Sequence, residues 1–269
     1  MKTVFITGAS SGIGAAVAKE YAKLGANLVL CARRTDRLNK VLEDCLKENP
    51  NVKAILVSCD VTKPDDLQRA AKKAIEAFGG IDIVLANAGF GVAGSVAKLT
   101  IDDYKRQFDT NVYGVINTVQ GTLEPLKKSK GCIGIVGSIY SYISEGFKSP
   151  YCMSKFAVRA LATSLRQEQR KNGIHVCLIA PGLIESEIRQ VDNQGIYNPE
   201  QKDYAPEFLR MPTNKAARQI VRALEKRKSE QIITNHGKIA VFLERHFPWF
   251  LDWLVSRYLI KMTKRPTAK

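Results

Sequence analysis

The chain has 269 residues, a length that one large domain with a sizeable core can fill. Its composition, 45% hydrophobic and 25% charged, is ordinary for a soluble globular protein. Six scattered cysteines, with neither a C-x-x-C pair nor neighbouring histidines, exclude metal-ligand spacing and argue against a disulfide framework. Free thiols and the lack of a signal peptide before the first strand predict a reducing, cytoplasmic location.

The net charge of +15 is unevenly distributed. Residues 210–269 carry fourteen Lys and Arg residues against four Asp and Glu residues. Such an excess can serve nucleic acid, an anionic membrane surface or an acidic partner, or can simply be a solvated surface. Nucleic acid is disfavoured among these partners.

In chain order, β-branched runs alternate with segments of helical spacing. The predicted strands are residues 2–6, 27–32, 52–58, 81–86, 131–137, 175–180 and 231–234. The predicted helices are residues 15–24, 36–47, 65–78, 100–128, 150–171 and 213–228. Thr100, with Asp103 three residues later, predicts a helix-capping box. The alternation indicates an α/β fold with a doubly wound parallel sheet, a single domain over residues 1–235 and a helical extension over 236–269.

A glycine-rich turn, TGASSGIG at residues 7–14, joins the first strand to the first helix. Gly8 suits a sharp turn, Gly12 allows close approach of a pyrophosphate, and Gly14 allows close packing of helix on strand. The free N–H groups and positive dipole of the helix start favour phosphate. Strand, glycine turn and helix together predict a dinucleotide site.

By the switch-point rule, a ligand lies across the carboxyl ends of the strands of an open parallel sheet. Those ends carry Gly8, Arg33, Asp60, Asn87, Ser138 and Pro181. These positions are therefore the first candidates for contact with a cofactor.

Tyr151 and Lys155 lie four residues apart on a predicted helix and share one face. An ammonium group beside a phenol lowers a pKa that is about 10 when unperturbed, which makes tyrosine a usable general acid. Ser138 can hydrogen-bond a substrate carbonyl or the tyrosine oxygen. The Tyr-Lys pair alone is common by chance, but the neighbouring strand-end motifs favour an active site. No G-x-S-x-G elbow surrounds Ser138, which disfavours a hydrolase triad.

Over residues 2–235 these motifs resemble the short-chain dehydrogenase/reductase family. The matching signatures, in order, are TGASSGIG, Asp60-Val61, Asn87-Ala88-Gly89, Asn111, Ser138, Tyr151-x-x-x-Lys155 and Pro181-Gly182. The resemblance implies a Rossmann fold and a catalytic set of Asn111, Ser138, Tyr151 and Lys155. It also implies cofactor contacts from Gly8, Ser11, Gly12, Ile13, Gly14, Asp60, Val61, Asn87, Ala88, Gly89, Tyr151, Lys155, Pro181, Gly182, Ile184 and Ser186.

In that resemblance Tyr151 exchanges a proton with the substrate oxygen, and Lys155 lowers its pKa and holds the nicotinamide ribose. Ser138 positions the carbonyl, and Asn111 holds a water in a relay towards Lys155. The chain departs from the family pattern in two places. Ser186 stands where many relatives have Thr, and Ala86 replaces the first Asn of the common NNAG run.

Cofactor choice follows from the end of the second strand. An NAD enzyme of this kind has an acidic residue there to bind the ribose 2′-hydroxyl, but this chain has Ala32 followed by Arg33 and Arg34. A guanidinium binds phosphate in bidentate fashion. We therefore predict NADP(H) rather than NAD, with Arg33 as the main contact and Ser10 and Arg34 assisting. The alternative is that these arginines face solvent and either cofactor binds.

Residues 183–211 are rich in Pro, Asn and Gln, have no clean period, and are expected to form a lid over the substrate. The expected apolar lining is Phe90, Tyr140, Phe147, Leu183 and Ile184, and the substrate contacts are Ser138, Tyr140, Phe147, Tyr151 and Leu183. This lining predicts an apolar ketone or alcohol, of a lipid or steroid type.

The segment 236–269 is basic and aromatic, too short and too charged to span a bilayer. It is expected to lie in a membrane interface, to contact another subunit of a homodimer or homotetramer, or to cover the substrate entrance. The predicted function is an NADP(H)-dependent oxidoreductase that interconverts a carbonyl and an alcohol. The alternative is a non-catalytic dinucleotide sensor or scaffold with the same fold.

Overall fold

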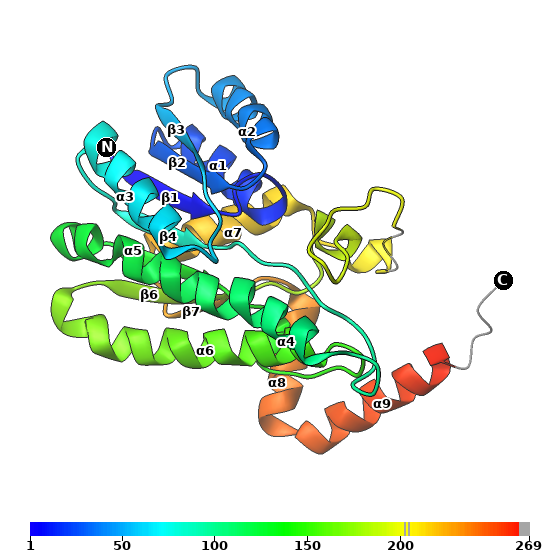
Figure 1. Cartoon of the computed structure of the whole chain (residues 1–269). Coiled ribbons are helices and arrows are strands. Elements are labelled where there is room, and N and C mark those ends of the chain that lie inside the picture. Colours follow the sequence, from blue (N-terminus) through cyan, green and yellow to red (C-terminus); the bar gives the residue numbers. More distant parts are fainter. Residues whose placement is uncertain (202, 204, 264–269) are drawn as a thin grey trace.

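The structure is a computed structural model that describes residues 1–201, 203 and 205–263. Seven parallel strands form one sheet in the order β3-β2-β1-β4-β5-β6-β7 (Figure 1). The strands are β1 Thr3–Thr7, β2 Asn27–Ala32, β3 Ala54–Ser58, β4 Ile83–Ala86, β5 Cys132–Val136, β6 His175–Ala180 and β7 Glu230–Ile232. The predicted doubly wound α/β fold is confirmed, and each predicted strand is present within a few residues of its expected bounds.

Nine α-helices are described. Their bounds are α1 Gly12–Lys23, α2 Thr35–Glu48, α3 Pro64–Phe78, α4 Ile101–Phe108, α5 Gly114–Ser129, α6 Ser149–Gln169, α7 Thr213–Glu225, α8 Asn235–His246 and α9 Pro248–Thr263. Thr100 and Asp103 form the expected reciprocal capping box. The single helix expected over residues 100–128 is interrupted by a π-helical turn, Asp109–Tyr113, which side-chain periodicity does not reveal.

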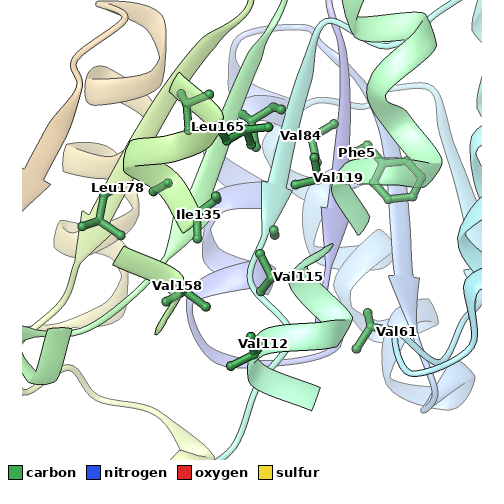
Figure 2. Packing of buried hydrophobic residues seen from close by; sticks show 14 of the residues in the cluster. Phe5, Val61, Val84, Val112, Val115, Val119, Ile135, Val158, Leu165 and Leu178 are labelled. Carbon is green, nitrogen blue, oxygen red and sulfur yellow. The ribbon is translucent and has the colours of Figure 1, made fainter. Parts of the chain in front are cut away.

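Helices cover both faces of the sheet because every central strand is apolar on both sides. Along β1, Val4 and Ile6 pack under α1, α2 and α7, while Phe5 points to the opposite layer. That opposite layer packs α3, α5 and α6 on the sheet through residues such as Val115, Val158 and Leu165 (Figure 2). Successive strand residues face opposite sides of the sheet, so a continuous apolar run is what a strand covered on both faces requires.

The order of the strands reverses between β1 and β4. The chain goes outward from β1 to β2 and β3, then returns to β4 on the other side of β1. The loops that follow β1 and β4 therefore lie side by side at the carboxyl edge of the sheet, where open α/β sheets bind their ligands. The predicted site residues lie along this edge.

Candidate active site

The glycine turn after β1 is shaped by close contacts that exclude larger residues. Gly8 and Gly12 have positive φ angles of 64° and 53°. A Cβ atom on Gly14 would lie 2.4 Å from the Gly8 carbonyl oxygen, and one on Gly8 would lie 2.8 Å from the Cα of Ala88. The turn is thus pressed against both α1 and the loop after β4, which leaves the backbone N–H groups at the start of α1 directed to the sheet edge.

Asn87 locks the loop after β4 onto this turn. Its Nδ2 donates to the carbonyl oxygens of Thr7 (3.0 Å) and Gly8 (3.2 Å). Its backbone N–H donates to the Thr7 hydroxyl at 3.0 Å. The predicted Asn87-Ala88-Gly89 contact segment therefore lies beside the glycine turn.

The structure brings Ser138, Tyr151 and Lys155 together. Ser138 follows β5 and is buried, with its backbone N–H donating to the Ser141 hydroxyl. Tyr151 and Lys155 lie on α6, and the Lys155 Nζ is 5.5 Å from the centre of the Tyr151 ring. That ammonium also donates to the carbonyl oxygen of Val136, at 2.9 Å. A phenol, a hydroxyl and an ammonium thus converge where β5 ends.

The lowered pKa expected for Tyr151 is not observed in this structure. Burial raises its pKa to about 12, although hydrogen bonding to the Ser138 hydroxyl opposes the rise. Burial also lowers the pKa of Lys155 to about 8. The expectation was wrong in sign because it counted the attraction between the two groups and omitted the cost of removing each charged form from water.

Asn111 lies in the π-helical turn between α4 and α5 and is buried. Its Oδ1 accepts from the Phe90 N–H at 3.1 Å, and its Nδ2 donates to the Phe90 carbonyl (3.0 Å) and the Ser154 hydroxyl (3.2 Å). The amide therefore ties the loop after β4 to α6, one residue before Lys155.

Asp60 and Val61 follow β3, further along the same edge of the sheet. Asp60 accepts from the Thr62 N–H and hydroxyl, and the Val61 carbonyl accepts from Asn117 Nδ2 at 2.9 Å. The Asp60 carboxylate is thus hydrogen-bonded within its own loop. Val61 packs against α5 at Gly114 and forms the surface of the sheet edge there.

Two arginines at the start of α2, Arg34 and Arg37, contact other side chains. Arg34 donates to the hydroxyls of Ser11 (2.9 Å) and Ser10 (3.4 Å). Arg34 and Arg37 both contact Glu187, which comes from residues 183–211, the segment expected to form a lid. Arg33 is exposed to solvent. Sequence analysis missed Arg37, although its position three residues after Arg34 on a helix was an available signal, and missed Glu187, for which no local signal exists.

Pro181 to Ser186 leave β6 and pass over the glycine turn. Ser186 lies against Gly12, where a Cβ atom would come within 3.4 Å of its Cβ. The Leu183 N–H donates to Nε2 of His236 at 3.1 Å, and burial lowers the pKa of that imidazole and favours its neutral, accepting form. His236 thus holds the segment that follows β6 in place through Leu183. Its position 53 residues further along the chain gave sequence analysis no means of finding it.

The expected apolar lining is only partly assembled. Tyr140 packs edge-on against Tyr151, with ring centres 5.9 Å apart, and its hydroxyl donates to Glu145. Phe90 and Ile184 are buried and Leu183 is half-buried. Phe147, in contrast, is 51% exposed. A cavity of about 250 Å³ lies beside Tyr140, lined by Tyr140, Ile143, Ser144, Glu145, Leu254 and Val255, so α9 forms one wall next to the tyrosine cluster.

The C-terminal helices α8 and α9 extend from the body of the protein (Figure 1). Among the side chains described up to residue 257, large apolar ones are exposed on α8, on α9 and at the residue that joins them, namely Ile239, Phe242, Phe247, Trp249, Phe250, Trp253 and Leu254, here called the aromatic patch. None of the helices that the structure describes is long and apolar enough to cross a bilayer. Residues 264–269, the last part of the segment expected to be basic and aromatic, lie outside the described residues.

Comparison with known proteins identifies the family of the chain. The sequence model of the family "short chain dehydrogenase" matches residues 2–196. A Dictyostelium discoideum protein named dehydrogenase/reductase SDR family protein 7-like is 31% identical, over 98% of this chain and 84% of its own length. A Danio rerio hydroxysteroid 11-beta-dehydrogenase 1-like protein is 30% identical, over 94% of this chain and 85% of its own.

Among solved structures, an alcohol dehydrogenase from Thermococcus sibiricus, complexed with 5-hydroxy-NADP, is 27% identical with a TM-score of 0.75. The match covers 87% of this chain and 96% of that one. The family match, the parallel sheet and the strand-end residues lead to one conclusion: the chain belongs to the short-chain dehydrogenase/reductase family and is an oxidoreductase.

Proposed function

We propose that this protein is an NADP(H)-dependent oxidoreductase that interconverts a carbonyl and an alcohol, with Tyr151 as the general acid and base. The observation that carries the proposal is the convergence of Ser138, Tyr151 and Lys155 at the end of β5, on the same sheet edge as the glycine turn. A phenol, a hydroxyl and an ammonium suit proton exchange with a substrate oxygen.

The glycine turn and the strand ends beside it suit a dinucleotide. The glycine turn is held open to phosphate by contacts that a Cβ atom on Gly8 or Gly14 would destroy. The residues that would hold the cofactor are Gly8, Ser10, Ser11, Gly12, Ile13, Gly14, Arg33, Arg34, Asp60, Val61, Asn87, Ala88, Gly89, Tyr151, Lys155, Pro181, Gly182, Ile184 and Ser186. When bound, the nicotinamide supplies or accepts the hydride.

The chain's own residues move the proton. Ser138 holds the substrate oxygen, and Tyr151 donates a proton to it during reduction or removes one during oxidation. Lys155 stabilises the charge that forms on the phenol, since its Nζ lies 5.5 Å from the ring centre. Burial raises the pKa of the Tyr151 phenol to about 12 and so makes it a weaker acid, which makes the nearby Lys155 ammonium necessary to stabilise the phenolate that forms when the proton is donated. Asn111 holds Phe90 and Ser154 in place and orients the start of α6.

NADP(H) is favoured over NAD(H) by the charge at the end of β2. Ala32 stands where a carboxylate would oppose a phosphate, and Arg33 and Arg34 follow it. Arg34 already reaches the hydroxyls of Ser10 and Ser11 in the glycine turn, so a 2′-phosphate there would meet a prepared guanidinium. The 5-hydroxy-NADP bound by the Thermococcus sibiricus relative supports the same choice.

The substrate class is an apolar ketone or alcohol of a lipid or steroid type. The cavity between Tyr140 and α9 is bounded by Ile143, Leu254 and Val255, next to the ring that packs on Tyr151. The name of the Danio rerio relative supports a steroid-like substrate. Six buried free cysteines support a reducing location such as the cytoplasm.

The aromatic patch supports two partners for α8 and α9. Exposed Trp and Phe side chains on basic helices suit the interface of an anionic membrane. Exposed apolar side chains of this kind also suit contact with a second copy in a homodimer or homotetramer.

A ketone panel with NADPH oxidation as the readout tests the function. Tyr151→Phe is expected to reduce kcat roughly 10²- to 10⁴-fold, because proton transfer by a positioned side chain contributes about that much. Binding of NADPH should persist. Tyr113→Phe, which removes an exposed hydroxyl, is the matched control. A protein that binds NADPH but oxidises none in the presence of any ketone, with or without Tyr151, would instead be a sensor or scaffold.

A further inference from the structure

The lid segment places a carboxylate between the two arginines at the start of α2. Both oxygens of Glu187 accept from Arg37 Nη1 at 2.6 Å, and Oε2 also accepts from Nη1 and Nη2 of Arg34, each at 3.3 Å. Glu187 begins a short 3₁₀ turn, Glu187–Gln190, 150 residues along the chain from Arg37. The three side chains, here called the carboxylate latch, join the lid to α2.

The surroundings of the latch are those of an anion site. Arg34 also donates to the hydroxyls of Ser10 and Ser11, in the turn expected to meet phosphate. The ring of Tyr197, from the lid, stacks on Arg37 with 4.7 Å between the guanidinium carbon and the ring centre. Two guanidinium forks at the N-terminus of a helix attract any anion, and Glu187 is the anion that the chain itself supplies.

The latch is also able to exchange its anion. The side chains of Arg34, Glu187 and Arg37 are 36%, 30% and 28% exposed, so water and a ligand can reach all three. Ion pairs with this exposure are weak, and breaking one changes an equilibrium by about fivefold at most. A phosphate monoester carries more charge than a carboxylate and has three acceptor oxygens, so it binds the same guanidinium groups more strongly.

We propose that Glu187 is an internal competitor for the 2′-phosphate of NADP(H), and that Arg37 is a further residue determining cofactor specificity. The proposal rests on the NADP(H) assignment above. When the phosphate takes the guanidinium groups of Arg34 and Arg37, Glu187 leaves and the turn Glu187–Gln190 separates from α2. An NAD(H) molecule has no 2′-phosphate and leaves the latch closed. Cofactor choice and lid position are thereby coupled at one pair of arginines.

Calorimetry tests the competition between Glu187 and the 2′-phosphate without any turnover. The two probes are adenosine 2′,5′-bisphosphate and AMP, which lacks the 2′-phosphate. Glu187→Gln should bind the bisphosphate about two- to fivefold more tightly than the unmodified chain, because the competing charge is gone. Its affinity for AMP should not change. The matched control is Glu185→Gln, which removes the same charge from an exposed residue two positions earlier, whereas the carboxylate that contacts both arginines belongs to Glu187. Arg37→Gln should weaken bisphosphate binding although the latch is also broken.

Hydrogen exchange over residues 187–197 gives a second readout. In the unmodified chain the bisphosphate should increase exchange and AMP should not, whereas Glu187→Gln should exchange rapidly before any ligand is added. Three results would each overturn the proposal. The Glu187→Gln and Glu185→Gln variants could bind the bisphosphate with equal affinity, Glu187→Gln could bind AMP more tightly than the unmodified chain, or the bisphosphate could slow hydrogen exchange over residues 187–197. If no variant binds the bisphosphate, the proposed competition between Glu187 and the 2′-phosphate is wrong. The oxidoreductase function is tested separately, by comparing ketone reduction with NADH in the unmodified chain and in Tyr151→Phe.

Discussion

Lys155 should destabilise the fold at neutral pH, and replacing it with Met tests this directly. The side chain is 6% exposed, and burial lowers its pKa from 10.5 to about 8. Since one pKa unit corresponds to 1.36 kcal/mol, the charged form costs about 3.4 kcal/mol of folding free energy at pH 7. Met fills a similar volume without the charge but leaves the Val136 carbonyl without its donor, a loss of about 1–3 kcal/mol. Lys155→Met should therefore be about 1–2 kcal/mol more stable at pH 7.

The sign of the pH dependence follows from linkage. Between pH 8 and pH 10.5 the unfolded chain holds the Lys155 proton and the folded chain does not, so the stability of the unmodified protein rises with pH. From pH 7 to pH 10 this gain is about 2.5 kcal/mol, and the variant does not share it. The advantage of Lys155→Met should thus disappear by pH 10.

Urea unfolding at both pH values measures the difference. Far-UV circular dichroism is the suitable signal, because both tryptophans lie on α9 and report that helix more than the core. Lys40→Met, on the exposed face of α2, is the control and should show no such change with pH. A stability difference between Lys155→Met and the unmodified chain that is the same at pH 7 and pH 10 would refute the claim that Lys155 carries a burial cost.

Two further predictions concern the ends of the site. Arg33→Ala should reduce the ratio of kcat/KM for NADPH to that for NADH by roughly tenfold, since a charge-assisted bond to phosphate is worth about 1.5 kcal/mol; an unchanged ratio would remove Arg33 from the phosphate site. Replacing Trp249 and Trp253 together with Ser should reduce pelleting with phosphatidylserine-containing vesicles, whereas Phe208→Ser, an exposed aromatic of the lid, should not. Unchanged pelleting combined with a smaller sedimentation coefficient would assign the aromatic patch to contact between copies.

Much of the fold could be predicted because its signals are local. A strand covered on both faces needs a continuous apolar run, and a helix start needs a cap, so β1 and the Thr100 box were both visible in the sequence. The glycine turn was equally readable, since a positive φ at Gly8 and the packing at Gly14 permit few other residues.

Other features depend on groups that only folding brings together. The π-helical turn that holds Asn111 inserts one residue into a helix whose side-chain period is otherwise regular. The sequence predicted α8 and α9 only as a helical extension. The position of α9 as a wall of the cavity beside Tyr140 comes from tertiary contact. The pKa of Tyr151 was misjudged because burial is a property of the packed site and not of the Tyr-x-x-x-Lys spacing.

The sequence by itself determined the parallel α/β sheet and the glycine turn after β1, and it singled out Ser138, Tyr151 and Lys155 as candidates, because each signal lies in residues close together in the chain or in a spacing that the backbone makes regular. Only the tertiary structure decided that Glu187 meets Arg37 and that His236 fixes the exit of β6. Ion pairs, hydrogen bonds and burial depend on groups that are close in space. Here the paired residues are separated by many residues of intervening chain.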